Sequence, residues 1–137
     1  VFDWDRMLAF EGNTGPYLLY TYVRIQSIFR KAREQGVADG YESAPLSINE
    51  PEEKQLALVL LRYPATVASV ARTLEPHRMC GYLYELAGTF SRFFEKCPVL
   101  KADTDASRLA RLRLCNLTSR VLEDGLDCLG IQTLERM

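Results

Sequence analysis

An all-α fold, an antiparallel or orthogonal bundle of about five to six helices, is the architecture that this 137-residue sequence predicts. Apolar residues recur at every third or fourth position in most segments, and no segment alternates apolar and polar residues over the length of a strand. All six prolines fall between the periodic segments, where all but Pro45 begin or end helices. The chain is long enough for one domain with a buried core and shows no internal repeat.

The amino-acid composition and net charge exclude several classes of function. The chain is 47% apolar and 26% charged, with a formal net charge of −1. No overall basic field therefore attracts nucleic acid or an anionic membrane, and any nucleic-acid site has to be local. No apolar run is long enough for a membrane span, and no signal peptide opens the chain. The first residue is Val1 rather than methionine, so we expect a fragment of a longer protein.

The first two predicted helices meet at a junction rich in glycine and proline. Residues 3–11 form a short leading helix with acidic residues in its first turn. A long helix then starts at Pro16, whose fixed φ suits the first helical position, and ends at Gly36. Gly12 and Gly15 let the chain bend tightly before it. The buried face of the long helix is expected to contain Leu18, Thr21, Ile25, Ile28, Phe29 and Ala32.

Helix-breaking and helix-capping residues indicate where the other helices begin and end. Residues 37–49 lose the helical period and are rich in acids, so we expect a loop that phosphate groups would repel. Asn49 and Glu52 have the spacing of a capping box at a helix start. Pro64 and Pro76 mark further boundaries, because proline fits a first turn but not a helix interior. The helices are expected over residues 49–63, 64–74, 76–97 and about 106–129.

Two of these helices supply most of the predicted core. The helix over 76–97 is the most periodic segment, and the helix over 106–129 is rich enough in leucine to lie centrally in a bundle. The expected inner faces are Met79, Leu83, Leu86, Phe90, Phe94 and Cys97 in the first, and Ala110, Leu114, Leu117 and Val121 in the second. In the second helix, Leu109, Leu112, Leu122 and Leu126 are expected to widen that face.

One side of the long helix carries two aromatic rings, a hydroxyl and two cations. The residues are Tyr17, Tyr20, Arg24, Ser27 and Lys31, spaced at i, i+3, i+7, i+10 and i+14. Rings followed by cations form a surface on which single-stranded nucleic acid can stack its bases and pair its phosphates. The same spacing also fits tyrosines half-buried at a helix junction beside solvated cations, and spacing alone favours that structural interpretation.

Sequence motifs for catalysis are missing. The chain has no phosphate-binding glycine loop, no nucleophile elbow and no zinc-protease motif. His77 is expected in the first turn of a helix, as an exposed or capping residue. The four cysteines lack C-x-x-C spacing, so we expect reduced thiols rather than a metal site, with disulfides as the less favoured alternative. The sequence therefore predicts a binding or structural module without a catalytic or metal site.

Three stretches carry a more specific pattern. Residues 2–11 lead into Gly-Asn-Thr-Gly-Pro-Tyr-Leu-Leu-Tyr at 12–20, and Tyr-Leu-Tyr-Glu-Leu-Ala begins a regular stretch over 82–100. Residues 111–137 start with Arg-Leu-Arg-Leu and end with Glu-Arg-Met. In this order, and over almost the whole chain, the three stretches resemble the anticodon-binding domain of arginyl-tRNA synthetases.

The resemblance implies a single all-helical domain of the DALR type over residues 1–137, in which 1–11 join it to a preceding catalytic domain. That catalytic domain would use ATP and magnesium to attach arginine to its tRNA, and no cofactor is expected in the present chain. The implied partners are the anticodon loop of the arginine tRNA and the catalytic domain of the same polypeptide, without DNA or membrane. A cytoplasmic location is implied, with an organelle as the alternative.

The resemblance also assigns site residues. The base-contacting positions of the family fall on Tyr17, Tyr20, Phe94 and Met137. Every arginine codon has G in the middle, so the anticodon presents a C that can be unstacked and packed against a ring or thioether. Phe94 departs from the pattern because it lacks a tyrosine hydroxyl, and Leu19 replaces a common glutamine. The candidates for phosphate contacts are Arg24, Arg30, Lys31, Arg111 and Arg113.

The sequence is also compatible with two other functions. The anticodon-binding domain of another class I synthetase, such as the cysteinyl enzyme, would share the helices but not the Gly-Asn-Thr-Gly-Pro-Tyr junction or the final Glu-Arg-Met. A helical protein–protein interaction module would use the tyrosines to dock a partner and would have no role with RNA. Tyr17 has a further alternative, contact with the catalytic domain instead of with a base.

Overall fold

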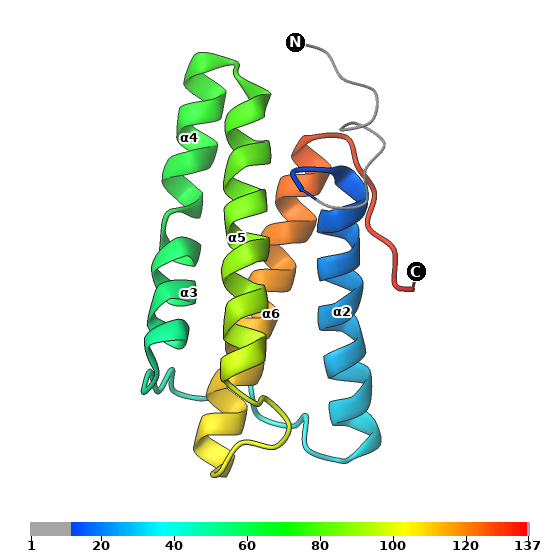
Figure 1. Ribbon diagram of the computed structural model, residues 1–137, viewed down its shortest axis with the longest axis vertical. Helices are drawn as coiled ribbons and strands as arrows, with labels where there is room; N and C mark the ends of the chain where they lie inside the picture. The colour runs from blue at the N-terminus through cyan, green and yellow to red at the C-terminus, as the bar shows by residue number, and fades with distance from the viewer. Residues whose placement is uncertain (1–11, 137) are drawn as a thin grey trace.

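A computed structural model describes residues 12–136, which form helices α2 (Gly15–Glu34), α3 (Pro51–Leu61), α4 (Tyr63–Thr73), α5 (Pro76–Lys96) and α6 (Asp105–Cys128). These residues contain no strand, so the predicted all-α class is confirmed. Consecutive helices run antiparallel, except that α4 continues in the direction of α3 (Figure 1). The leading helix predicted over residues 3–11 lies outside the described part of the chain.

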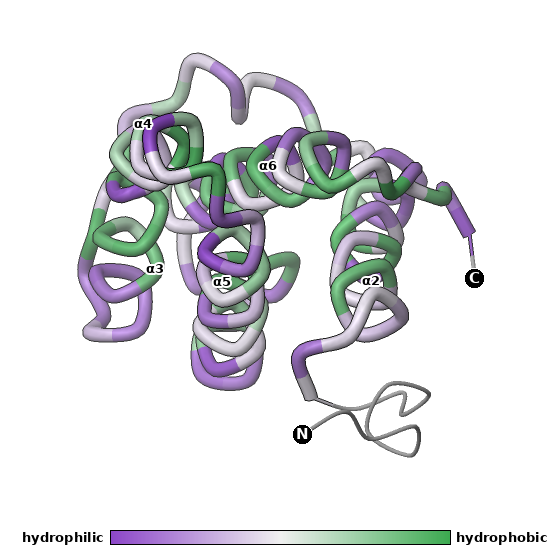
Figure 2. The backbone as a smooth tube through the Cα atoms, turned by 90° about the horizontal axis from the view of Figure 1, so that it is seen from above, coloured by the Kyte–Doolittle hydropathy of each residue, from purple (hydrophilic) through white to green (hydrophobic). Residues whose placement is uncertain are grey.

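Helix α5 occupies the middle of the bundle. It lies between α3 and α4 on one side and α2 on the other, with α6 behind it, as Figures 1 and 2 both show. Its predicted inner face is confirmed except at one position, because Phe94 is only half-buried. The neighbouring Phe93 is fully buried instead. A helix turns by about 100° per residue, so adjacent phenylalanines cannot both face the same side of the core.

Helix α6 buries a broad face, and most of the prediction for it is confirmed. Ala110 and Leu114 are buried as expected, but Leu117 and Val121 are half-buried at the surface, and that part of the prediction is wrong. Contacts with α2 on one flank and with α3 and α5 on the other turn the predicted Leu112, Leu122 and Leu126 inward, together with Cys115, whereas Leu109 is half-buried. The predicted buried face of α2 is confirmed at every position.

The starts of α2 and α3 each differ by one residue from the prediction. Helix α2 begins at Gly15, and its N-cap is Thr14, whose Oγ1 accepts a hydrogen bond from the backbone N–H of Tyr17 at 3.4 Å. The capping box of α3 uses Glu50 and Glu53 rather than the predicted Asn49 and Glu52. Pro51 takes the first helical position, which fixes the residue before it as the cap.

A buried ion pair joins α3 to α6. Nε of Arg111 lies 2.6 Å from Oε1 of Glu53, whose side chain is 1% exposed. Burial alone would raise the pKa of Glu53, but the hydrogen bond from Arg111 and those from the backbone N–H groups of Asn49 and Glu50 outweigh it and lower the pKa. These partners leave neither carboxylate oxygen without a hydrogen bond, and the pair ties the start of α3 to the second turn of α6.

Helices α5 and α6 approach closely at Gly125. A Cβ atom added to Gly125 would lie 2.6 Å from Cδ2 of Leu83, which is itself fully buried. Such a distance is far inside van der Waals contact, so the absent side chain sets the separation of the two helices.

The loop between α2 and α3 is attached to the bundle at two points. The ring of Tyr41 lies 5.1 Å from the ring of Phe29, measured between centroids. The guanidinium of Arg113 on α6 donates a hydrogen bond to the carbonyl of Ala44, which is buried. Among the described helices, none is long and apolar enough to cross a membrane.

Candidate nucleic-acid interface

An aromatic and cationic surface follows the line along which α2 meets α5. We call it the α2–α5 strip. It consists of Tyr17, Tyr20, Arg24, Ser27 and Lys31 of α2, Tyr84 and Phe94 of α5, and Lys101 of the connector before α6. Tyr17, Arg24 and Lys31 are seven residues apart, so they lie along one side of α2 over about 21 Å.

Two tyrosines shape the end of the strip at the start of α2. The rings of Tyr17 and Tyr84 lie 5.7 Å apart and are tilted by 58°. Tyr17 is half-buried and packs against the core, whereas Tyr20, one turn further along, is 57% exposed. Tyr20 is therefore the ring on which a base can stack without any displacement of the protein, because its surface already faces solvent.

A cation covers the aromatic ring in the middle of the strip. Cζ of Arg24 lies 4.2 Å from the ring centroid of Phe94. Behind it, Phe94 stacks on the fully buried Phe90, with ring centroids 6.1 Å apart. The guanidinium carbon thus lies within cation–π distance of a ring that the core supports.

The far end of the strip is a groove between α2 and the connector that follows α5. Its volume is about 430 Å³. Arg24, Lys31 and Lys101 bring three cations to it, and no acidic residue lines it. The apolar lining comes from Ile28, Phe94, Pro98, Val99 and Leu100. Cations beside an apolar floor suit a phosphate joined to a base or sugar, since both parts of the nucleotide find a partner.

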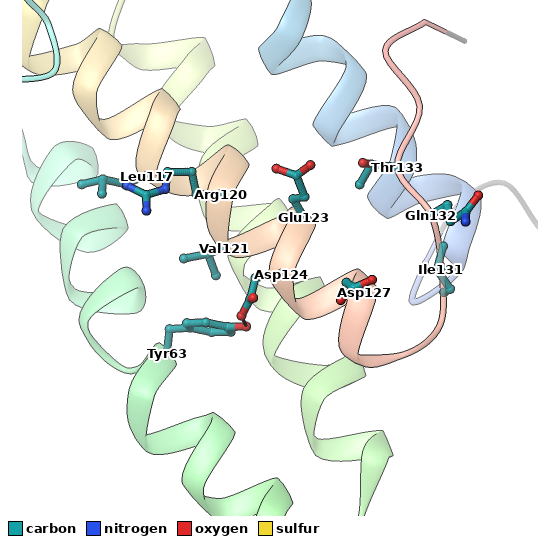
Figure 3. A pocket seen from close by; sticks show the side chains of 10 residues that line it. All are labelled: Tyr63, Leu117, Arg120, Val121, Glu123, Asp124, Asp127, Ile131, Gln132 and Thr133. Carbon is teal, nitrogen blue, oxygen red and sulfur yellow. Dashed lines mark hydrogen bonds between the residues drawn. The ribbon is translucent and has the colours of Figure 1, made fainter.

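A larger hollow, on the outer side of α6, has the opposite charge. It has a volume of about 860 Å³, and Glu123, Asp124 and Asp127 place carboxylates in it (Figure 3). The hydroxyl of Tyr63 donates a hydrogen bond to Asp124 across it. Burial, together with this carboxylate, raises the pKa of Tyr63 well above its ordinary value. Phosphate groups would be repelled here, so the groove of the α2–α5 strip is the better nucleic-acid site.

The structure brings together some of the predicted site residues and separates others. Tyr17, Tyr20, Arg24, Lys31 and Phe94 all lie on the α2–α5 strip. The guanidinium of Arg111 is engaged by Glu53 and by the carbonyl of Pro98, and that of Arg113 by the carbonyl of Ala44. Arg30 is not among the residues that line the groove, and Met137 lies outside the described residues.

Two members of the strip are not among the residues selected from the sequence. Tyr84 is 42% exposed on the face of α5 away from the core. Its position opposite the apolar stripe of a periodic helix was a usable signal, because a large ring on a solvent face is unusual. Lys101 stands in an irregular connector, where no periodic pattern could indicate which way it points.

The thiols and the histidine show no sign of catalysis. All four cysteines are free, as predicted, although Cys128 is exposed and Cys80 only half-buried. Burial raises the pKa of the Cys97 and Cys115 thiols, which keeps them protonated and unreactive. His77 is exposed in the first turn of α5. Within residues 12–136, no group of three His, Cys, Asp or Glu side chains is placed to hold a metal ion.

Fold and strip together define an all-helical domain with an aromatic and cationic surface, and comparison with known families identifies its class. Residues 18–137 match the family described as the DALR anticodon binding domain. The match covers most of the chain, which therefore belongs to this family.

The sequence relatives identify the branch of the family. The chain is 55% identical over 137 residues to the arginine–tRNA ligase of Cronobacter sakazakii, which covers 100% of this chain and 23% of the relative. It is also 55% identical over 139 residues to the arginine–tRNA ligase of Salmonella typhimurium strain LT2, with the same two coverages. The present chain thus spans less than a quarter of the length of these relatives.

Solved structures agree with the sequence relatives. The arginyl-tRNA synthetase of Plasmodium falciparum superposes with a TM-score of 0.82 at 33% identity, covering 99% of this chain and 23% of that one. The arginyl-tRNA synthetase of Thermus thermophilus also gives a TM-score of 0.82, at 36% identity, covering 95% and 22%. The predicted resemblance to the anticodon-binding domain of arginyl-tRNA synthetases is confirmed.

Proposed function

We propose that this domain binds the anticodon loop of the arginine tRNA and holds it so that the catalytic part of the same polypeptide can attach arginine. ATP and magnesium belong to that catalytic part, which lies outside the present chain. The partners are the tRNA and the catalytic domain, and the setting is the cytoplasm. Tyr20 receives an unstacked base, and Tyr17 and Met137 are the further base contacts that the family resemblance suggests.

The observation that carries the proposal is the order of groups along the α2–α5 strip. An open ring at Tyr20 is followed by a ring-backed guanidinium at Arg24 and then by a groove with two lysines. This is the arrangement that a short single strand requires, because bases stack on planar groups while the backbone follows the cations. A tyrosine stripe that served only to dock a protein would not need three cations lining an acid-free groove.

The α2–α5 strip also indicates which cations contact the phosphates. Arg24, Lys31 and Lys101 are the phosphate contacts of the proposal, because their side chains line the open groove. Arg111 and Arg113 instead hold partners within the domain, and the proposal does not include them among the phosphate contacts. One stacked base is worth about 1–3 kcal/mol, so the isolated domain binds weakly and in a strongly salt-dependent manner.

The experiment compares Tyr20→Ala with Tyr20→Phe in binding to an anticodon stem-loop of the arginine tRNA, measured by fluorescence anisotropy. Tyr20→Ala should weaken binding by roughly 5- to 150-fold, the equivalent of the loss of one stacked base. Tyr20→Phe keeps the stacking face and should retain most of the affinity. The circular dichroism of both variants should be unchanged, because Tyr20 is mostly exposed.

Specificity is tested with the same stem-loop carrying U instead of C at the middle anticodon position. The arginine stem-loop should bind more tightly than this variant and more tightly than a cysteine anticodon stem-loop. Equal affinity of wild type and Tyr20→Ala, with native circular dichroism, would overturn the proposal in favour of a protein-docking role. Preference for the cysteine stem-loop would instead favour the cysteinyl alternative.

A further inference from the structure

Helix α4 is unusual because none of its residues is buried. It has 11 residues, and Arg72 is the only one of them that carries a charge. A surface helix ordinarily buries an apolar stripe on the bundle and turns charged residues to solvent. Helix α4 packs only partly buried residues on the bundle and carries a single charge, so its outer side is poorly suited to lie against water.

The two sides of α4 differ in what they contact. Tyr63 and Val70 face the bundle, where both pack against the core and the ring of Tyr63 lies 5.7 Å from that of Tyr82. Next to this contact, one flank of α4 carries exposed apolar residues spaced at i, i+3, i+4, i+7 and i+10, which places them on one face. We call this face the α4 stripe, and it consists of Pro64, Val67, Ala68, Ala71 and Leu74.

Leu74, at the end of the stripe, is unfavourable for two independent reasons. It ends α4 in the left-handed conformation, with φ 56° and ψ 36°, where glycine is the residue that fits without strain. Its side chain is also 82% exposed. A leucine that is both strained and exposed destabilises the isolated domain, and burial of its side chain against another surface would offset both effects.

The charges around the stripe argue against RNA as the covering molecule. Arg62 is paired with Glu85 at 2.6 Å, and Arg78 is paired with Glu75. These cations are already neutralised, so they offer little to a phosphate backbone. The α2–α5 strip, where the cations are open, lies on the other side of α5 from α4 (Figures 1 and 2).

We propose that the α4 stripe docks against the catalytic part of the same polypeptide. The inference rests on the proposed function, and it names the surface through which the two parts contact each other. The relatives are more than four times as long as this chain, since it covers 23% of their length. A large covalently attached partner is present at high effective concentration, so a stripe of three helical turns is sufficient for stable contact.

The position of the stripe fits this partner. The hairpin formed by α4 and the first half of α5 extends beyond the ends of α2 and α6, with Leu74 close to its tip (Figure 1). The tip points toward the end of the bundle at which α2 begins, where the polypeptide enters the described domain. A partner joined to the domain at this end would meet the projecting hairpin first.

The first experiment is hydroxyl-radical labelling of the 137-residue chain and of the full-length polypeptide that contains it, read out by mass spectrometry. Labelling of Leu74 and Val67 should fall severalfold in the full-length protein. Leu46, an exposed leucine of the loop before α3, is the matched control and should be labelled equally in both. Equal labelling of Leu74 in the two proteins would overturn the proposal.

The second experiment introduces Leu74→Asp, with Leu46→Asp as control. Aspartate tolerates the left-handed conformation, so the domain should still fold. In the full-length protein, Leu74→Asp should lower the kcat/KM of arginine attachment to tRNA by about tenfold, the equivalent of one lost buried leucine, and Leu46→Asp should not. Unchanged kcat/KM with Leu74→Asp contradicts the docking.

Binding and sedimentation measurements on the 137-residue chain separate this inference from the proposed function. Leu74→Asp should leave its affinity for the anticodon stem-loop unchanged, and the wild type should sediment as a monomer. Weaker stem-loop binding would show that RNA covers the stripe, and a wild-type dimer dispersed by Leu74→Asp would show that a second copy does. Either result overturns the proposal, whereas failure of the wild-type chain to bind the stem-loop would defeat the proposed function alone.

Discussion

The guanidinium of Arg24 lies over the ring of Phe94, with Cζ 4.2 Å from the ring centroid. The two residues come from α2 and α5, 70 positions apart in the chain, and meet at the edge of the groove. A base that reaches this point therefore meets a guanidinium as well as the phenyl ring. Arginine can stack with a base and pair with a phosphate at once, so the missing hydroxyl of Phe94 is less important than the sequence indicates.

We expect Arg24 and Phe94 to be coupled in stability. A double-mutant cycle with Arg24→Gln, Phe94→Leu and the double variant should give an interaction energy of about 0.5–1 kcal/mol, the usual range for a partly exposed cation–π contact. Urea unfolding followed by circular dichroism measures it. Additive effects of the two substitutions would mean that the guanidinium does not lie on the ring in solution.

Salt dependence should identify the phosphate contacts. Lys31→Gln and Lys101→Gln should each reduce the slope of log K against log salt concentration by about 0.7, the value for one phosphate contact on a single strand. Lys54→Gln, an exposed lysine of α3 outside the groove, removes the same charge and should leave the slope unchanged. Anisotropy titrations with the anticodon stem-loop at several salt concentrations provide the slopes. Equal slopes for all three variants and the wild type would exclude the groove as the phosphate site.

Because of the Glu53–Arg111 pair, the stability of the domain should decrease at acidic pH. The pKa of Glu53 is lower in the folded protein than its ordinary value of 4.5, so the folded state binds its proton less readily than the unfolded state. The stabilisation is therefore complete above about pH 5 and is lost as the pH falls through 4.5 towards the lower folded value. Urea unfolding at pH 7 and at pH 4 should show this loss.

The variant Glu53→Gln should lower the free energy of unfolding at pH 7 by about 3–5 kcal/mol, because it leaves the largely buried Arg111 without a countercharge. Its stability should also vary less between pH 7 and pH 4 than that of the wild type. Glu52→Gln, next to it and partly exposed, is the control and should retain the wild-type pH dependence. The same pH dependence in Glu53→Gln as in wild type would assign the acid sensitivity to other carboxylates.

Substitution of alanine for two glycines within helices should change the stability of the domain in opposite directions. Gly125→Ala places a Cβ 2.6 Å from the buried Leu83 and should destabilise the domain by about 1–3 kcal/mol through overpacking. Gly81→Ala in α5 meets no atom within 4 Å, and should stabilise the domain by about 0.5–1 kcal/mol through helix propensity. Thermal and urea unfolding of the two variants provide the comparison. Stabilisation by both would show that α5 and α6 can separate at Gly125 without loss.

Local patterns predicted the helices well, because helix periods, caps and prolines act over a few residues. The buried face of α2 is confirmed at every position, since this helix has one packed side. In α6 the same reasoning selected Leu117 and Val121 wrongly, because partners on two flanks decide which leucines of a leucine-rich helix are buried. The one-residue error at the start of α3 came from the competition between Asn49 and Glu50, which Pro51 decides.

The grouping of residues in the candidate site was predictable where they lie on one helix and unpredictable where they come from several. Tyr17, Tyr20, Arg24 and Lys31 share a side of α2, and their spacing was sufficient to group them. The role of Arg111 depends on Glu53, 58 residues earlier, so the sequence offered no reason to prefer an internal ion pair over a phosphate. Lys101 joins the groove only because the connector after α5 folds back toward α2.

The contact between α2 and α6 has a consequence for the order in which the domain folds. Nε2 of Gln26 donates a hydrogen bond to Oγ of Ser119 at 2.8 Å, across 93 residues of sequence. During synthesis α2 leaves the ribosome early, and α5 can cover only part of its apolar face before α6 follows. Because contacts between distant residues are slow to form, we expect α3, α4 and α5 to assemble first and α2 to dock last, once α6 has been made.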